Sequence, residues 1–375
     1  MLRETLGCVE SVTASAYTVP TDRPEADGTL TWDETTLVLV QVRCDGVVGT
    51  GWTYGSPACV QVVHGLLAPL LTGRAPLDTG AAWAAMVQAL RNVGRPGVGG
   101  MALSAVDCAL WDLKARLLGV PLHRLLGAVH DGVPLYGSGG FTTYDADELT
   151  TALEEWTAAG LTRVKIKVGE SWGRRADRDL ARTAQARDVV GPDVELFVDA
   201  NGGYDVGQAV RMAEAYDGLD VRWFEEPVSS DDLAGLATVR ARASADVTAG
   251  EYGYDLAYLA RMARAGAVDC LQVDVTRCGG ITELLRVAAV AASCGLQVSG
   301  HCAPHLHAAP LLAVPNLAHL EWFHDHVRIE TMLFDGTAPP EPGGILRPDA
   351  SRPGHGLEWR SEAAEQYRLR EPSGA

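Results

Sequence analysis

This sequence is short of positive charge, has no Cys-x-x-Cys pair, and contains no long apolar run. Lys and Arg number 31 against 48 Asp and Glu, and the resulting net charge of −17 disfavours nucleic acid or an anionic membrane surface as a partner. No apolar run is long enough to span a bilayer, and residues 1–6 lack the apolar core of a signal peptide. The eight cysteines are scattered. We therefore expect a cytoplasmic protein with reduced thiols.

The remaining composition is typical of a globular protein. Hydrophobic residues make up 47% of the 375 positions and charged residues 21%. This length suggests two domains, or one large barrel with an addition. The negative net charge does not exclude a small anionic substrate, because lysines and a bound metal ion can reverse the local field.

Residues 1–127 are predicted to form a separate α+β lobe. Residues 35–43 read as a strand that turns at Asp45–Gly46 into a second strand over 47–52, which together make a hairpin. The segment 20–32 is rich in Pro, Asp, Glu and Gly, and this composition predicts a surface loop.

Two helices are predicted in the same lobe, over residues 56–73 and 102–116. Between them, residues 92–100 are rich in glycine but lack the Gly-Lys-Ser/Thr ending of a phosphate loop, so nucleotide binding is not expected. Because they are polar and glycine-rich, we expect this loop and the 20–32 loop to close over the substrate.

Strands and helices alternate from Val133 to about Trp322, within a predicted barrel domain of residues 128–330. Seven or eight β/α units in about 190 residues are what a (β/α) barrel requires. The remaining residues, 331–375, are rich in Pro and Gly. Helices are expected at about 146–160, 174–190, 205–217, 230–243, 255–266 and 280–294.

Two lysines share one face of the predicted strand within Thr162–Gly169. Lys165 and Lys167 are two residues apart, so their side chains point in the same direction. Buried side by side, each would have a lowered pKa and could act as a base near neutral pH. The alternative is that both lie on a solvated face.

Three further strands end in an acid. Asp199, Glu225 and Glu251 are spaced 26 and 26 residues apart, about one strand–helix unit. The carboxyl ends of barrel strands converge on one mouth, where three carboxylates would repel one another without a cation. Oxygen ligands favour a hard cation, above all Mg²⁺. The alternative is that these acids cap helices or lie in loops.

The polar residues that follow complete a pattern that resembles the mandelate-racemase subgroup of the enolase superfamily. Asp274 ends the strand Leu271–Asp274, His301 lies 27 residues later, and Glu321 follows 20 after that. The resemblance covers nearly the whole chain. It implies a modified TIM barrel with an N-terminal α+β capping domain, to which the C-terminal segment returns, and a homo-oligomer.

The resemblance also implies the chemistry. Removing the proton next to a carboxylate creates a second charge, which Mg²⁺ stabilises as an enediolate. Lys167 and His301 would act from opposite sides, Asp274 would orient His301 and raise its basicity, and a protonated Glu321 would donate to the developing oxyanion. Two opposed groups allow racemisation or epimerisation, and they also allow loss of water.

One position departs from the subgroup pattern. A lysine often stands three residues after the dyad aspartate, where this chain has Arg277, and an arginine cannot serve as a base. Muconate-type cycloisomerases carry a catalytic lysine on this strand instead of the Asp–His dyad, so the dyad argues against that branch. Acid-sugar dehydratases fit better. Polar groups for a polyol substrate are expected from Thr142, Tyr144, His324 and His326.

Two other classes of protein stay open. A zinc hydrolase could use His305 and His307, or His324 and His326, but such enzymes carry His-x-His on the first barrel strand and Val133–Gly137 has none. A binding protein that kept the barrel fold but lost catalysis should lack at least one metal ligand or base, whereas this chain keeps all of these residues. We therefore predict dehydration of an acid sugar, with racemisation as the alternative.

Overall fold

The structure is a computed structural model that describes residues 7–370. Eight parallel strands form a barrel that is closed by pairing of the last strand, β11, with the first, β4. The predicted barrel is thereby confirmed. The eight strands are β4 (Val133–Gly139), β5 (Arg163–Lys167), β6 (Glu195–Asp199), β7 (Val221–Glu225), β8 (Asp246–Ala249), β9 (Cys270–Val273), β10 (Gln297–Gly300) and β11 (Leu317–Phe323).

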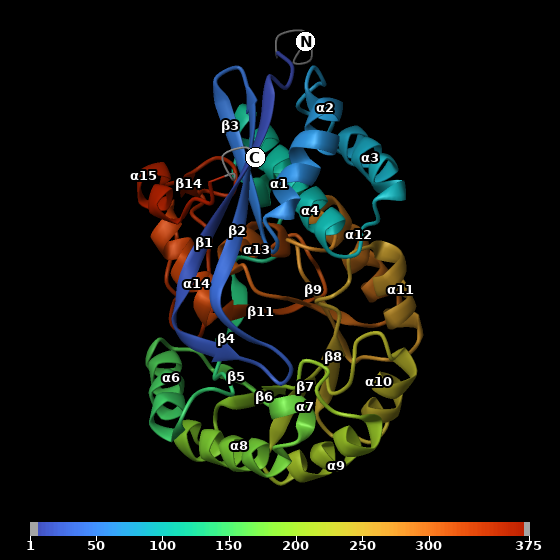
Figure 1. Ribbon diagram of the computed structural model, residues 1–375, viewed down its shortest axis with the longest axis vertical. Helices are drawn as coiled ribbons and strands as arrows, with labels where there is room; N and C mark the ends of the chain where they lie inside the picture. Colours follow the sequence, from blue (N-terminus) through green and yellow to red (C-terminus); the bar gives the residue numbers. More distant parts are fainter. Residues whose placement is uncertain (1–6, 371–375) are drawn as a thin grey trace.

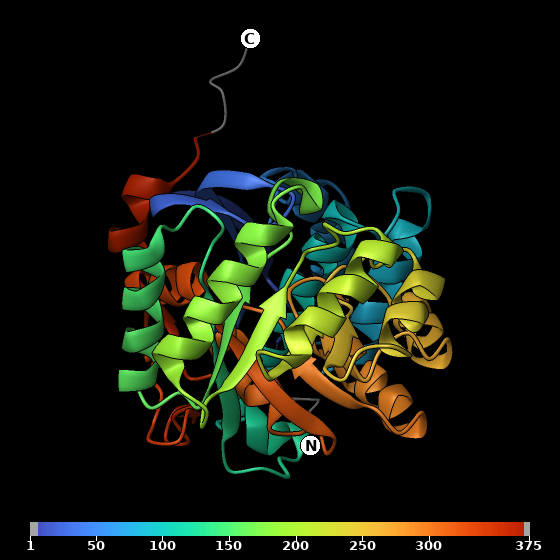
Figure 2. The same cartoon turned by 90° about the horizontal axis from the view of Figure 1, so that it is seen from below.

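Helices surround the barrel, as Figures 1 and 2 show. Several begin with an aspartate whose carboxylate accepts a hydrogen bond from the first turn, as Asp145 does from Glu148 N–H and Asp205 from Gln208 N–H. The outer helices are α6 (Ala146–Ala158), α8 (Ala176–Val190), α9 (Val206–Asp217), α10 (Leu233–Arg240), α11 (Leu256–Arg264), α12 (Gly280–Ser293), α13 (Pro304–Leu311) and α14 (His324–Leu333), with a short α7 (Glu170–Gly173) after β5.

The N-terminal lobe packs a three-stranded antiparallel sheet against helices. Gly49 and Gly51 allow the long helix α4 to lie directly on β3, because a Cβ at either position would come within 2.3 Å of an α4 carbonyl oxygen. The elements are β1 (Ser11–Ala26), β2 (Thr31–Cys44), β3 (Val47–Tyr54), α1 (Ala58–Val62), a π-helical turn (Val63–Leu67), α2 (Ala68–Leu71), α3 (Thr79–Ala89), a 3₁₀ turn (Leu90–Asn92), α4 (Val98–Leu117) and α5 (Leu122–Leu126).

Three predictions for this lobe were wrong in detail. Residues 56–73 form three short helical pieces instead of one helix, and α4 begins at Val98, inside the segment predicted as a loop. The 20–32 segment is mostly strand, because β1 and β2 extend into it and leave only a short turn. Pro20 is tolerated because β1 is the edge strand of its sheet and bulges after this residue.

The extended β1–β2 hairpin reaches from the lobe to the barrel, as its blue ribbon shows in Figure 1. At its tip, Trp172 N–H on α7 donates to Gly28 O at 2.9 Å, and Thr142 N–H donates to Ala26 O at 2.8 Å. The hairpin tip therefore lies against the segments that follow the first two barrel strands.

The C-terminal segment contacts both the barrel and the lobe. Its strand β13 (Ile345–Leu346) pairs with β4. His355 N–H donates to Asp112 on α4 at 2.9 Å, and Arg116 on the same helix pairs with Glu358 at 2.6 Å. The remaining elements are β12 (Phe334–Asp335), β14 (Glu358–Trp359), α15 (Ser361–Ala364) and a 3₁₀ turn (Glu365–Tyr367). The domain boundaries at 127 and 330 stay a prediction. Over residues 7–370, no helix combines the length and apolar character needed to cross a bilayer.

Substituting Gly28 with alanine should lower kcat/KM about tenfold or more, because small displacements near a site are costly. A Cβ at Gly28 would meet Val168 O and Ala200 O at 2.7 Å, so the hairpin tip must move away from the barrel mouth. Gly80→Ala on α3 is the matched control, since its Cβ meets nothing within 4 Å. If the folded Gly28→Ala variant has an unchanged kcat/KM, the hairpin does not act as a lid.

Glu25→Gln on the hairpin should stabilise the protein more at alkaline than at acidic pH. Burial, aided by the Asp325 carboxylate, raises the pKa of Glu25 to about 8. The folded protein thus holds a proton that the unfolded chain releases near pH 4.3, so this group's contribution to stability declines between about pH 4 and pH 8. Glutamine does not titrate, so this decline in stability is absent, and its side chain can still accept a hydrogen bond from Trp32 Nε1. Thermal unfolding of both proteins across this range is the measurement, and a pH-independent difference between them would contradict the assignment.

Candidate active site

Three carboxylates meet at the mouth of the barrel. Asp199 and Glu225 end β6 and β7 in register with each other and with Lys167 on β5, so their side chains lie next to one another. Glu251 lies two residues after the end of β8. All three acids are buried, and one ligand atom from each lies within 4.8 Å of the others. The structure thus brings together the three residues that the sequence predicted as metal ligands.

Both lysines of β5 are buried against these acids. Lys165 is 0% exposed, and its Nζ lies 2.6 Å from Glu225 Oε1 and 2.8 Å from Glu321 Oε1. Lys167 is 5% exposed and donates to Asp199 Oδ2. The alternative of a solvated face is therefore wrong.

The predicted lowering of the lysine pKa values is also wrong for this state of the site. Burial alone lowers the pKa of Lys165, but the carboxylates of Glu225 and Glu321 outweigh it and hold the pKa well above its ordinary value. Lys167 behaves in the same way, because the Asp199 carboxylate overrides burial and raises its pKa. The sequence showed two adjacent cations, and only the fold showed how many anions face them.

His301 and Asp274 form the predicted dyad. His301 Nδ1 lies 2.8 Å from Asp274 Oδ2, while Asp274 Oδ1 accepts from Thr276 N–H at 2.6 Å. On the other side of the ring, His301 Nε2 lies 3.1 Å from Glu251 Oε2. Burial lowers the pKa of His301, but the sulfur of Cys302 and the nearby carboxylates raise it well above its ordinary value. Asp274 keeps its charge, with a pKa lowered to about 2 against the effect of burial by His301 and Arg277.

The charges around Glu321 favour its ionised form, whereas the family resemblance predicted a protonated donor. Burial raises its pKa, but the charges of Lys165 and His301 lower it far more, so the pKa lies below its ordinary value. The carboxylate accepts hydrogen bonds from Ser138 Oγ at 2.6 Å and from Cys302 N–H at 3.1 Å. Both oxygens of Glu321 therefore already accept hydrogen bonds, as expected of a carboxylate.

Arg277 bridges the dyad and the acidic triad. Its guanidinium lies 3.3 Å from Glu251 Oε1 and 3.4 Å from Asp274 Oδ2. It also lies over the ring of Tyr252, 5.4 Å from the centroid. The arginine that departs from the subgroup pattern thus contributes charge to the site without being able to exchange a proton.

The donor set fits a hard divalent cation. The three facing carboxylates offer only oxygen, which Mg²⁺ prefers. Beside them, Asn201 Oδ1 and Glu226 Oε1 are buried and have no hydrogen-bond partner among the described residues. Buried acceptors without donors are costly unless a cation or its water shell satisfies them.

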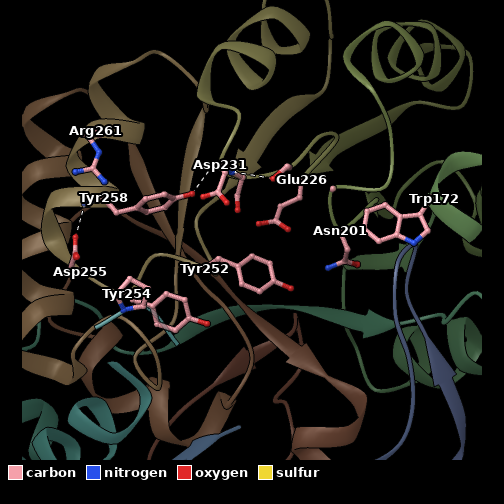
Figure 3. A pocket seen from close by; sticks show the side chains of 13 residues that line it. Trp172, Asn201, Glu226, Asp231, Tyr252, Tyr254, Asp255, Tyr258 and Arg261 are labelled. Carbon is pink, nitrogen blue, oxygen red and sulfur yellow. Dashed lines mark hydrogen bonds between the residues drawn. The ribbon is translucent and has the colours of Figure 1, made fainter. Parts of the chain in front are cut away.

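A pocket of about 470 Å³ opens next to this triad. Figure 3 shows Trp172 and Asn201 on one side and Tyr254, Tyr258 and Arg261 on the other. Trp172 is 62% exposed and has a left-handed backbone, an uncommon conformation for a bulky residue. Pro96 of the glycine-rich loop also lines the pocket, as expected for a loop at the barrel mouth.

Sequence reasoning missed the aromatic wall of this pocket. Tyr252 and Tyr254 lie one and three residues after the predicted ligand Glu251, and that position alone could have marked them. Trp172 and Arg261 carry no such signal, because they lie on α7 and α11 and reach the pocket only through the curvature of the barrel.

The residues expected to bind a polyol do not line this pocket. Thr142 Oγ1 donates to Asp27 O at 2.8 Å, and His324 Nε2 pairs with Asp22 at 3.0 Å, so both hold the hairpin. His326 stacks on Tyr54 at 3.5 Å between centroids. Tyr144 is buried in the core.

Of the histidines in the zinc-hydrolase alternative, His324 lies in a group with Asp22 and Glu25 that could hold a metal ion, whereas His305 and His307 are occupied elsewhere. His305 Nδ1 lies 2.7 Å from Glu330 Oε2, and His307 Nε2 accepts from Val275 N–H at 2.8 Å. Within residues 7–370, neither histidine belongs to a cluster that could hold a metal ion.

Comparison with known proteins covers both parts of the chain. Residues 11–127 match the mandelate racemase / muconate lactonizing enzyme N-terminal domain, and residues 148–364 match the enolase C-terminal domain-like family. The chain is 32% identical to D-galactarolactone cycloisomerase of Agrobacterium fabrum, over 94% of this chain and 96% of the relative.

Solved structures agree with this assignment. A mandelate racemase/muconate lactonizing enzyme-like protein from Rubrobacter xylanophilus is 50% identical, with a TM-score of 0.93 over 96% of this chain and 99% of the other. L-talarate/galactarate dehydratase from Salmonella typhimurium, liganded with Mg and L-lyxarohydroxamate, is 26% identical, with a TM-score of 0.88 over 99% and 95% of the two chains.

Proposed function

Because the chain belongs to the mandelate racemase/muconate lactonizing enzyme family of the enolase superfamily, we propose that it dehydrates an acid sugar to a 2-keto-3-deoxy acid. The reaction would remove the proton alpha to the carboxylate and expel the neighbouring hydroxyl as water. The substrate class is supported by the dehydratase among the structural neighbours, whose bound ligand is a sugar-acid analogue.

One observation carries the proposal: the acidic triad has a different proton-bearing group at each end. Lys167 contacts Asp199 at one end, and His301 Nε2 lies 3.1 Å from Glu251 Oε2 at the other. A substrate carboxylate held by a cation at the triad would thus place its α-carbon between an amine and an imidazole. This is the arrangement that elimination needs, since one group takes a proton while another delivers one.

Asp199, Glu225 and Glu251 would hold Mg²⁺, with Asn201 and Glu226 beside them. When bound, the cation supplies electrostatic stabilisation to the negative charge that develops on the substrate carboxylate. Lys165, between Glu225 and Glu321, offsets the negative charge of the buried acids and keeps them close together.

The two proton-transfer groups share the first step and differ in the second. Once a bound cation offsets the carboxylates that raise the pKa of both groups, Lys167 Nζ or His301 Nε2 would take the α-proton, according to which face of the substrate carries it. His301 Nε2 then protonates the departing hydroxyl, while Asp274 fixes the ring through Nδ1. The β1–β2 hairpin and the 92–100 loop would exclude water from the mouth during the reaction.

Cycloisomerisation of a sugar lactone is the second candidate function, because a relative of that activity is 32% identical along nearly its whole length. This finding reopens a branch that the Asp274–His301 dyad had argued against. Racemisation or epimerisation needs the same groups and also stays open.

Incubating the protein with Mg²⁺ and a panel of acid sugars and their lactones in D₂O, followed by NMR, would separate these reactions. A 2-keto-3-deoxy acid is the expected product. Ring opening of a lactone without loss of water would instead establish the cycloisomerase. An epimer deuterated at the α-carbon, without keto acid, would establish the epimerase.

We also infer that the protein is a cytoplasmic homo-oligomer. The compartment is supported by the eight cysteines, all within residues 7–370, which form no disulfide. The assembly rests on the family resemblance, and light scattering of the purified protein would test it.

A further inference from the structure

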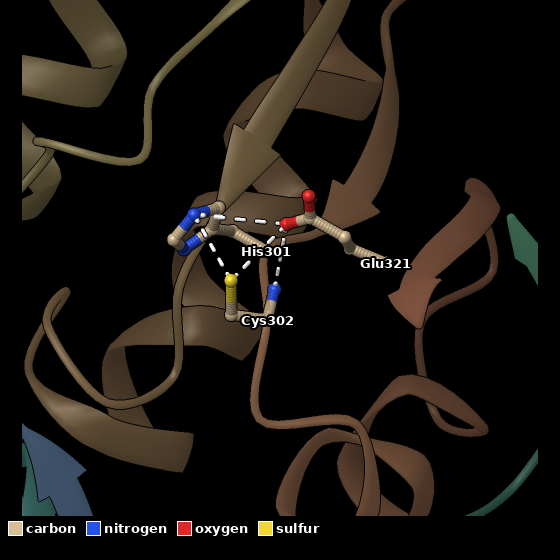
Figure 4. A group of neighbouring side chains, drawn as sticks. All are labelled: His301, Cys302 and Glu321. Carbon is tan, nitrogen blue, oxygen red and sulfur yellow. Dashed lines mark hydrogen bonds and ion pairs between the residues drawn. The ribbon is translucent and has the colours of Figure 1, made fainter. Parts of the chain in front are cut away.

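A thiol stands beside the histidine of the dyad, and the proposed reaction does not use it. Cys302 follows His301 directly and is buried, with its backbone in the left-handed region. Its Sγ lies 3.3 Å from His301 Nε2 and 3.2 Å from Glu321 Oε2. His301 Nε2 and Glu321 Oε2 are themselves 3.6 Å apart. Figure 4 shows the three side chains pointing toward one another.

The atoms that face the centre of this group are held in place by contacts on their other sides. His301 binds Asp274 through Nδ1, and its Nε2 faces both the thiol and Glu251 Oε2. Glu321 binds Ser138 Oγ and Lys165 through Oε1, and its Oε2 faces the thiol and the N–H of Cys302. A carboxylate that binds the far nitrogen of a histidine, as Asp274 binds His301, is typical of the residues that surround metal ligands.

We propose that His301, Cys302 and Glu321 form a second cation site, separate in chemistry from the oxygen triad, that binds Zn²⁺ or a similar thiophilic ion. Zinc bonds of about 2.0–2.1 Å to N or O and about 2.3 Å to S, in tetrahedral geometry, place neighbouring ligand atoms about 3.4–3.6 Å apart. The three observed separations, 3.3, 3.2 and 3.6 Å, nearly form one face of that tetrahedron. On binding, the thiol proton leaves to solvent as the sulfur–metal bond forms, and no oxidation is involved.

The two sites differ in the ions they select. Three carboxylates favour hard Mg²⁺, whereas one thiolate, one imidazole and one carboxylate favour a softer ion. A cation at the second site occupies His301 Nε2, so Zn²⁺ would block proton transfer by the imidazole. The binding does not depend on the proposed function, whereas the inhibition does.

The test is direct titration of the Mg²⁺-loaded protein with Zn²⁺ and Co²⁺ in excess Mg²⁺. Co²⁺ should produce a thiolate-to-metal charge-transfer absorption in the near ultraviolet. Calorimetry should find one Zn²⁺ whose affinity falls by more than about 100-fold in Cys302→Ser, since losing a direct ligand costs at least as much as losing an outer contact. Cys302→Ala provides a second variant if the serine protein is unstable.

Cys270→Ser is the matched control, because it removes a buried thiol from β9 at the opposite end of the barrel strands. Its Zn²⁺ affinity and Co²⁺ spectrum should be those of the unmodified protein. The proposal would be overturned if folded Cys302→Ser and Cys302→Ala both bound Zn²⁺ as tightly as the unmodified protein. It would also be overturned if the Co²⁺ spectrum of the unmodified protein lacked the thiolate band. Since both readouts are made without substrate, they stand whether or not the acid-sugar reaction is found.

Discussion

Glu225→Gln is expected to lower the affinity for Mg²⁺ by more than about 100-fold, beyond the loss typical of an outer contact, and to abolish turnover with it. Glu225 is the middle member of the triad, buried between Asp199 and Glu251 at the end of β7. Glutamine keeps the size of the side chain but removes its charge. The two remaining carboxylates then provide an incomplete set of anionic ligands for a cation that sheds its water reluctantly.

Isothermal calorimetry with Mg²⁺ measures the first effect and NMR product formation the second. Glu195→Gln is the control, because it changes an exposed glutamate at the start of the adjacent strand β6, paired with Arg163. Thermal unfolding should show that both variants fold. Unchanged Mg²⁺ affinity in Glu225→Gln would show that the triad is not the magnesium site.

His301→Asn should reduce dehydration by about 10³-fold or more, within the range for losing a general acid, while leaving part of the α-proton exchange intact. Asparagine can still approach Asp274 and Glu251, but it cannot accept or deliver a proton. Lys167 stands at the other end of the triad, so a substrate whose α-hydrogen faces the lysine can still lose it.

The measurement is deuterium incorporation at the α-carbon in D₂O, followed in parallel with release of keto acid. The reciprocal variant Lys167→Ala should lose exchange from the lysine face and keep it from the histidine face. If His301→Asn forms product at the unmodified rate, His301 is not the acid that expels the hydroxyl, and the division of tasks is wrong.

The order of the site along the chain was readable from the sequence because barrel architecture repeats. Asp199, Glu225 and Glu251 each follow an apolar run at a spacing of 26 residues, and parallel strands bring such positions to one mouth. Asp274, His301 and Glu321 continue the same series, and the structure places all of them around the triad. Where the strand register is regular, residues at strand ends that are spaced along the chain therefore come together at the barrel mouth.

Protonation states were not readable in this way. A lysine pair on one strand suggested lowered pKa values, and a strand-end glutamate suggested a protonated acid. The structure reverses both, because Lys165 lies between Glu225 and Glu321, where the two carboxylates stabilise its charged form and it stabilises that of Glu321. A pKa depends on every charge within a few ångströms, and those charges come from strands far apart in the chain.

The sequence by itself determined the barrel, the capping lobe and the order of the acidic, basic and histidine positions, since hydrophobic periodicity and strand-end spacing are local properties. Only the tertiary structure decided that the 20–32 segment is a hairpin lying on the barrel mouth and that Trp172 and Arg261 line one pocket beside the triad. It also decided that Cys302 faces His301 and Glu321. Each of these features depends on contacts between side chains from separate elements. The packing of strands and helices sets those contacts, and no single stretch of the chain specifies that packing.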